Sequence, residues 1–181
     1  MTEAQIKLLF HTYRSRPDPT YSGLFFSPTC MQICRPIPTF AATTREMIVR
    51  YQKDADDGML SFGDDTTPTK EGSKEISKLL YSIHPIPPLS VTFGTQESCA
   101  AINKTPEQLA TQAKEEGWVG MRVDLWDESE EGLLIKVQYW WREEHGDGGK
   151  VWRQCLHDIL YLGLKDGSEG YGEVEVRERG W

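Results

Sequence analysis

The chain has 181 residues, of which 38% are hydrophobic, and a formal net charge of −8 at pH 7. This length fits one domain with a substantial core. The acidic balance argues against nucleic acid and anionic membrane surfaces as partners, because neutralising phosphates requires clustered Lys and Arg. No stretch approaches the roughly 18 apolar residues of a membrane span, and the first residues lack a signal-peptide pattern. We therefore expect a cytoplasmic protein with a single domain over residues 1–181.

The four cysteines are few for this length and lie among apolar, strand-like residues: Cys30, Cys34, Cys99 and Cys155. This setting is typical of reduced, buried thiols rather than of disulfides. Cys30 and Cys34 are close in sequence, but no second Cys/His pair follows at ligand spacing. We expect no metal site and no cofactor.

Three segments begin with a capping-box pattern, in which Thr is followed three residues later by Gln or Glu. The predicted helices are residues 3–14, after Thr2 and Gln5; residues 44–55, after Thr43 and Glu46; and a helix after Thr105 and Gln108. The third helix has Pro106 at its favoured first position and ends at Gly117, which suits a C-terminal cap.

The segment at about 56–104 has the least regular pattern and reads as an irregular insertion, either a lid or disordered. Apolar spacing within it favours one short helix at 74–83, and residues 89–93 are a possible edge strand.

From Gly120 onward the apolar residues alternate with polar ones, which predicts strands. The expected strands are residues 121–127, 133–142, 151–164 and 173–179, separated by Gly-containing turns. Successive short turns predict an antiparallel meander, and residues 30–34 are expected to join its edge as a further strand. The fold class is therefore α+β, with a strongly curved antiparallel sheet wrapped around helices and an internal pocket.

Two-residue loops at Glu131-Gly132 and Asp147-Gly148 would fix which side chains share a face of the sheet. Asp124 would lie opposite Tyr139, and Trp141 would lie between Arg122 and Gln154. The face predicted in this way contains Arg122, Asp124, Trp126, Val137, Tyr139, Trp141, Gln154, Leu156, Asp158 and Leu160. A loop of odd length would move the partner strand's residues to the other face.

An apolar wall with a few polar groups is typical of a small-molecule pocket. In this interpretation Asp124 is the general acid or base, Arg122 orients it and stabilises negative charge, and Tyr139 donates a hydrogen bond. The predicted substrate-binding residues are Trp126, Trp141, Gln154 and Asp158. The alternative is a structural Arg122–Asp124 ion pair among core aromatics.

The opposite face contains mixed polar and aromatic residues, which suits the interface of a homodimer. His157 belongs to that face and is expected to be an interface or surface histidine. Tyr13 and Tyr51, on the first two helices, are expected to pack in the core.

The order of elements, the run Leu24-Phe-Phe-Ser-Pro28 and the Thr-Thr-Arg-Glu helix start resemble the NTF2-like superfamily, which includes the SnoaL-like cyclases. This resemblance implies a cone-shaped α+β fold. It also implies isomerase, cyclase or dehydratase activity on polyketide-like or terpenoid substrates, or ligand binding alone. The strand Arg122-Val-Asp-Leu is similar to the Arg-x-Asp strand of limonene epoxide hydrolase, but that family's second Asp has no clear match.

We therefore expect a cofactor-independent acid–base enzyme of secondary metabolism, acting as an isomerase, cyclase or dehydratase on a small, apolar, oxygenated metabolite. The alternatives are a non-catalytic ligand-binding or dimeric protein-interaction module of the same fold, or an epoxide hydrolase.

Overall fold

The computed structural model describes residues 2–14, 23–56, 79–86, 91–127, 133–146, 148–169 and 174–177. Its helices are α1 (Glu3–Arg14), α3 (Arg45–Asp56), α4 (Gln96–Ala100) and α5 (Pro106–Glu115), with short 3-10 turns at Gly23–Phe25 and Pro38–Phe40. Its strands are β1 (Phe26–Cys34), β2 (Leu79–Pro85), β3 (Val119–Asp127), β4 (Leu133–Gly146), β5 (Gly149–Leu164) and β6 (Val174–Arg177). None of the helices in this described part is long and apolar enough to cross a membrane.

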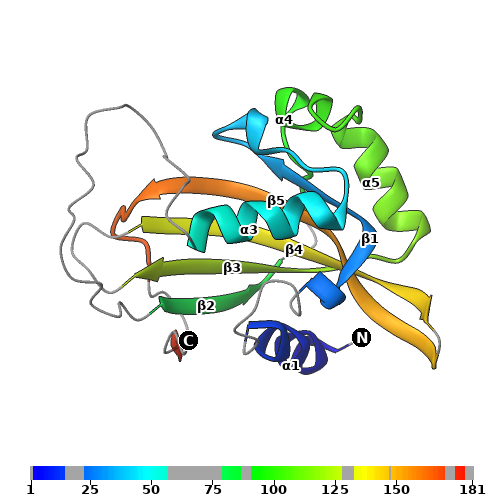
Figure 1. The fold of residues 1–181 in the computed structure, drawn as a ribbon, viewed down its shortest axis with the longest axis horizontal. Coiled ribbons are helices and arrows are strands. Elements are labelled where there is room, and N and C mark those ends of the chain that lie inside the picture. Colours follow the sequence, from blue (N-terminus) through cyan, green and yellow to red (C-terminus); the bar gives the residue numbers. More distant parts are fainter. Residues whose placement is uncertain are drawn as a thin grey trace.

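The strands form a single curved sheet in the order β1-β5-β4-β3-β2-β6 (Figure 1). Strands β3, β4 and β5 are the predicted antiparallel meander. Strand β1 joins the edge as predicted, and it runs parallel to β5. Strand β6 crosses to the other edge and pairs with β2. The prediction of a mixed α+β fold with a curved sheet is therefore confirmed, although β1 and β6 leave the sheet open.

The capping patterns located the helices well. Thr2 and Gln5 exchange both capping-box bonds at the start of α1, and Thr105 and Gln108 do the same at α5. After α5, Gly117 has a φ of +63°, as expected of a glycine C-cap. At α3 the cap is Thr44, whose hydroxyl accepts from the amide of Met47, so the assignment to Thr43 was wrong by one residue.

The segment at 56–104 has more regular structure than expected. The helix predicted at 74–83 is wrong for its described part, because Leu79 to Ile83 belong to β2. That strand pairs with β3 on one side and β6 on the other, so tertiary pairing overrides the helical spacing. Helix α4 was not predicted, although Thr95 and Ser98 form a capping box there. Residues 91–95 form no strand, and residues 57–78 and 87–90 lie outside the described part.

The register of the meander differs from the prediction at the first hairpin. Asp124 pairs with Lys136 and Arg122 pairs with Gln138, a shift of three residues from the predicted partners. Because this shift is odd, Tyr139 projects from the face opposite to Asp124.

At the second hairpin the ladder closes on Gly146 and Gly149, which confirms the two-residue loop at 147–148 and the pairing of Trp141 with Gln154. A bulge between Trp140 and Trp141 then places Tyr139 opposite His157. A regular ladder continuing from Trp141 and Gln154 would have placed Leu156 opposite Tyr139 instead.

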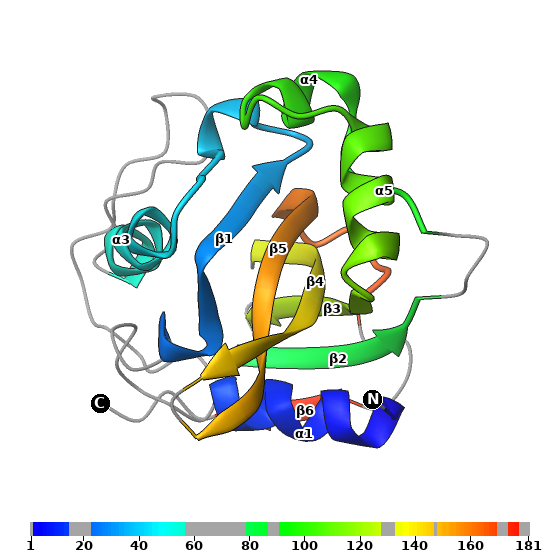
Figure 2. The ribbon, with the colours of Figure 1, turned by 90° about the vertical axis from the view of Figure 1, so that its right-hand side faces the viewer.

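Helices cover both faces of the sheet, with α3 and α5 on opposite sides (Figure 2). The α1/α3 face is the side on which α1 and α3 pack against Tyr81, Val123, Val137, Tyr139 and Trp141. The α5 face is the side on which α5 and residues 93–102 pack against Ile33, Trp140 and Leu156. The two faces bury separate hydrophobic clusters, so each has its own surroundings for polar groups.

The α5 face needs a glycine at one position. A Cβ on Gly120 would lie 2.6 Å from two ring atoms of Trp140, which is buried. We expect Gly120→Ala to lower the free energy of unfolding by about 1–3 kcal/mol through overpacking. Gly148→Ala is the control, because nothing lies within 4 Å of its Cβ position. Urea unfolding of both variants checks this, and equal stabilities would contradict the reason given.

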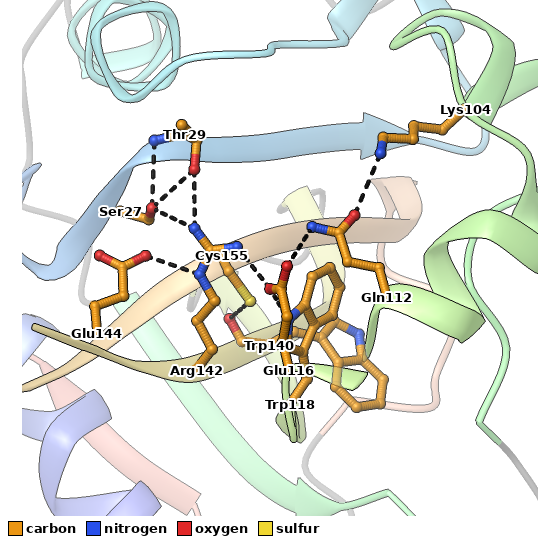
Figure 3. A network of polar contacts seen from close by, with 10 residues as sticks. All are labelled: Ser27, Thr29, Lys104, Gln112, Glu116, Trp118, Trp140, Arg142, Glu144 and Cys155. Atoms are coloured by element: carbon orange, nitrogen blue, oxygen red, sulfur yellow. Dashed lines mark hydrogen bonds and ion pairs between the residues drawn. The ribbon is translucent and has the colours of Figure 1, made fainter. Parts of the chain in front are cut away.

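Arg142 on β4 joins three parts of the fold through a network of polar contacts (Figure 3). Its guanidinium donates to Glu116 after α5 at 2.7 Å, to Glu144 at 2.8 Å, and to the hydroxyls of Ser27 and Thr29 on β1. Burial tends to raise the pKa of Glu116, but hydrogen bonds from Trp118, Gln112 and Arg142 lower it overall. The charges of this network are satisfied by one another, so we assign it a structural role.

Candidate functional site

The predicted site residues lie on two faces of the sheet rather than on one. Arg122, Asp124, Trp126 and Asp158 belong to the α5 face, and Tyr139, Trp141 and Gln154 belong to the α1/α3 face. The structure therefore does not bring Asp124 and Tyr139 together, because the odd shift at the first hairpin separates them.

Arg122 and Asp124 form the ion pair that their spacing predicted. Nε and Nη2 of Arg122 donate to the two carboxylate oxygens of Asp124, each at 2.9 Å. The carboxylate is 4% exposed and the Arg122 side chain 39% exposed. Both oxygens of Asp124 are thus engaged by one guanidinium, which leaves this carboxylate poorly placed to accept a proton from a substrate.

Asp158 is fully buried and holds a loop against the sheet. It accepts two hydrogen bonds from Arg35, at 3.0 and 2.7 Å, and a third from the amide of Gly94 at 2.8 Å. Arg35 also donates to the backbone and side chain of Thr92. These bonds indicate that Asp158 and Arg35 hold the segment containing Thr92 and Gly94 in place, rather than that Asp158 contacts a substrate.

On the α1/α3 face, the strands β4 and β5 bring four polar side chains together. Tyr139 lies directly opposite His157, and Trp141 lies directly opposite Gln154. The rings of Tyr139 and His157 meet edge to face with centroids 4.9 Å apart. Nε2 of His157 lies 2.6 Å from Oε1 of Gln154. Because an amide oxygen only accepts, Nε2 carries the hydrogen and Nδ1 holds the lone pair.

Helix α1 adds Tyr13 and Arg14 to this group. The ring of Tyr13 lies 6.4 Å from that of Tyr139, centroid to centroid. Gln52 of α3 donates to the hydroxyl of Tyr13 at 2.8 Å. The guanidinium of Arg14 lies 5.9 Å from the centre of the Tyr13 ring. We call Tyr13, Arg14, Tyr139, Trp141, Gln154 and His157 the tyrosine–histidine cluster.

Burial sets the protonation states of this cluster. It lowers the pKa of His157 to about 3, so the imidazole is neutral at physiological pH. Burial raises the pKa of Tyr139; the proximity of Tyr13 adds to the rise and the charge of Arg14 opposes it. Burial likewise raises the pKa of Tyr13, although the charge of Arg14 and hydrogen bonding with Gln52 and Arg14 lower it in part. Both phenols therefore keep their protons and can donate hydrogen bonds.

Three donors of the cluster are buried without a partner among the residues that the structure describes. They are Nε of Arg14, Nε1 of Trp141 and Nε2 of Gln154. An unpaired buried N–H group is costly, and native structures rarely keep one without a reason. Three such donors in one cluster favour a binding site for a molecule that offers oxygen acceptors.

The neutral state of His157 predicts a pH dependence of stability. The folded pKa lies below the unfolded one, so the unfolded state binds the proton first as the pH falls. Between pH 6.5 and 5 we expect the free energy of unfolding to drop by roughly 1 kcal/mol for each pH unit because of this group.

Urea unfolding at several pH values measures this slope. His157→Gln should remove it, whereas His145→Gln should keep it, because His145 is exposed on β4. An unchanged slope in His157→Gln would contradict the burial effect.

Sequence reasoning missed three members of the cluster. His157 was assigned to the opposite face, at an interface or surface, but it is 3% exposed. Tyr13 is buried, as predicted, yet it also takes part in this polar group. Arg14 was not singled out, and its position in the last turn of α1 beside a buried Tyr was the available signal.

The four cysteines are free and buried, as predicted. Burial raises the pKa of Cys30 and of Cys155, which keeps these thiols protonated. Among the described residues no group of three or more His, Cys, Asp and Glu side chains is placed to hold a metal ion.

Comparison with known proteins identifies a family. A family model described as a SnoaL-like domain matches residues 1–178, nearly the whole chain. A search of curated proteins and a search of solved structures each found no match. The resemblance suggested by the sequence is therefore confirmed at the level of the family, and this family has an NTF2-like cone with helices against a curved sheet.

Proposed function

The chain belongs to the SnoaL-like family. On this premise we propose that it is an acid–base enzyme that removes a proton from the carbon next to the carbonyl group of a small, mostly apolar molecule. The observation that carries this proposal is the group of three unpaired donors beside two protonated tyrosines and a neutral histidine. Such a group is complementary to the oxygen atoms of a ketone or a similar substrate.

His157 would act as the base. Its Nδ1 lone pair takes a proton from the carbon next to the substrate carbonyl, and the C–H electron pair moves onto the carbonyl oxygen as an enolate. A pKa of about 3 makes the free imidazole a weak base. A negative enolate formed beside it would stabilise the imidazolium and raise that pKa during the reaction.

Tyr139 and Arg14 would hold the enolate oxygen. The phenol donates a hydrogen bond and the guanidinium supplies positive charge, in surroundings that exclude most water. Return of the proton to another carbon gives isomerisation. Attack of the enolate carbon on a second carbonyl gives cyclisation, and loss of a neighbouring hydroxyl together with a proton gives dehydration.

Ligand binding without catalysis is the second candidate. Two observations favour this role: the low pKa of His157, and the contacts of its imidazole with the rings of Phe26 and Tyr139. A tightly packed imidazole with a low pKa is a poor proton acceptor. Epoxide hydrolysis has less support, since Arg122 and Asp124 lie away from the cluster. The homodimer and the cytoplasmic location stay predictions.

Deuterium exchange tests the proposal without knowledge of the natural substrate. The protein is incubated in D₂O with cyclohexanone, 2-cyclohexenone and acetophenone, and deuterium uptake next to the carbonyl is measured by mass spectrometry. We expect at least one ketone to exchange faster than in buffer, at a rate proportional to protein concentration. Saturable binding of these ketones, measured by ligand-observed NMR, with exchange no faster than in buffer would favour the binding role instead.

A further inference from the structure

The α5 face carries a second group of polar side chains, centred on Arg122. The direct cross-strand neighbours of Arg122 are His84 on β2 and Gln138 on β4. Directly opposed residues project from the same face, with Cβ atoms about 5 Å apart. His84, Arg122 and Gln138 thus form a row across three strands, on the side opposite to the tyrosine–histidine cluster.

The row is held in place by buried neighbours. Asp124 binds Arg122 through Nε and Nη2, which leaves the Nη1 edge outside that pair. Nε2 of His84 lies 2.9 Å from the hydroxyl of Ser82, which is fully buried opposite Asp124. Arg122 itself remains 39% exposed, so a small molecule can reach its guanidinium.

Gln138 supplies an independent observation. Its side chain is 6% exposed, and its Oε1 is buried without a partner in the part of the chain that the structure describes. A buried amide oxygen without a donor is unfavourable. The row therefore combines a partly exposed hydrogen-bond donor, the guanidinium of Arg122, with a buried acceptor, Oε1 of Gln138, to which no described group donates.

The electrostatics select a neutral ligand. The charge of Arg122 is balanced by Asp124, and the lone pairs on Oε1 of Gln138 would repel a carboxylate or a phosphate. The net charge of −8 on the chain disfavours anions further. A group that presents a C=O next to an N–H satisfies both side chains, since the carbonyl accepts from Arg122 and the N–H donates to Gln138.

We propose that the α5 face of β2, β3 and β4 binds a neutral amide or lactam group at Arg122 and Gln138, with His84 beside them. This site is separate from the proposed catalytic cluster and does not depend on it.

Three probes test this site on the whole chain. 2-Pyrrolidone offers C=O and N–H, cyclopentanone lacks the N–H, and acetate is an anion. We expect saturable binding of 2-pyrrolidone at millimolar concentrations, followed by ¹⁵N NMR at the Arg122 Nε–H, with much weaker binding of the other two. Equal binding of 2-pyrrolidone and cyclopentanone, or no saturable shift at Arg122, would overturn the proposal.

A variant pair adds a second test. Gln138→Met keeps the length of the side chain and removes its oxygen, and it should weaken 2-pyrrolidone binding about tenfold. Gln96→Met is the matched control and should bind as the wild type does, because Gln96 is an exposed residue at the start of α4. Unchanged binding in Gln138→Met would refute the role of Gln138 whatever the probe comparison gives.

Discussion

Replacing Tyr139 by Phe is expected to lower the rate of ketone deuterium exchange about 100- to 1,000-fold. The phenol is the proposed donor to the enolate oxygen, and the loss of one such donor from a water-poor site has an effect of this size. The variant removes only the hydroxyl, so the ring contacts with Phe10 and His157 persist. Exchange rates at equal protein concentration, measured by mass spectrometry, give the comparison.

Asp124→Asn is the control for that result. Asp124 lies on the α5 face, and its carboxylate is bound by Arg122 rather than directed to the cluster. If the cluster is the site, this variant keeps its exchange rate as long as it remains folded. Loss of exchange in a folded Asp124→Asn protein, with normal exchange in Tyr139→Phe, would return the catalytic role to the Arg122–Asp124 pair.

Replacing Arg142 by Met is expected to lower the free energy of unfolding by about 2–4 kcal/mol. The guanidinium is 17% exposed and binds two carboxylates and two hydroxyls on different elements. Its removal takes the bound guanidinium from Glu116 and from Glu144, which is 18% exposed and keeps only the longer contact with Arg153 at 3.7 Å, and the loss of a close partner from a largely buried charge is strongly destabilising. For a chain of this size we expect the melting temperature to fall by about 5–12 °C.

Lys150→Met gives the matched comparison for Arg142. Lys150 also binds a glutamate, Glu143, but its side chain is 66% exposed. Surface pairs of this kind contribute about 1 kcal/mol or less. Similar losses of stability in the two variants would show that the Arg142 network is an ordinary surface contact.

Much of the fold was predictable because its signals are local. Capping residues such as Thr2 and Thr105 bond within one turn of their helices, so the sequence alone locates the starts of α1 and α5. Alternating apolar residues located β3, β4 and β5 for the same reason. Strand β2 was missed because its conformation depends on partners far away in sequence, on β3 and β6.

The site was less predictable because the faces of a sheet depend on register. An odd shift at one hairpin moved Arg122 and Asp124 away from Tyr139, while Trp141 and Gln154 kept their predicted pairing. A bulge between Trp140 and Trp141 then brought His157 opposite Tyr139. Neither the bulge nor the length of a loop is specified by residue type alone.

The most direct test of the proposed site observes its unpaired donors. On addition of the ketone that exchanges fastest, the indole N–H resonance of Trp141 should shift in ¹H–¹⁵N NMR, because its buried donor gains an acceptor. The indole of Trp118 already donates to Glu116 at 2.8 Å and should not move. A ketone that shifts neither Trp141 nor the side-chain amide of Gln154, but shifts Arg122, would contradict a site on the α1/α3 face.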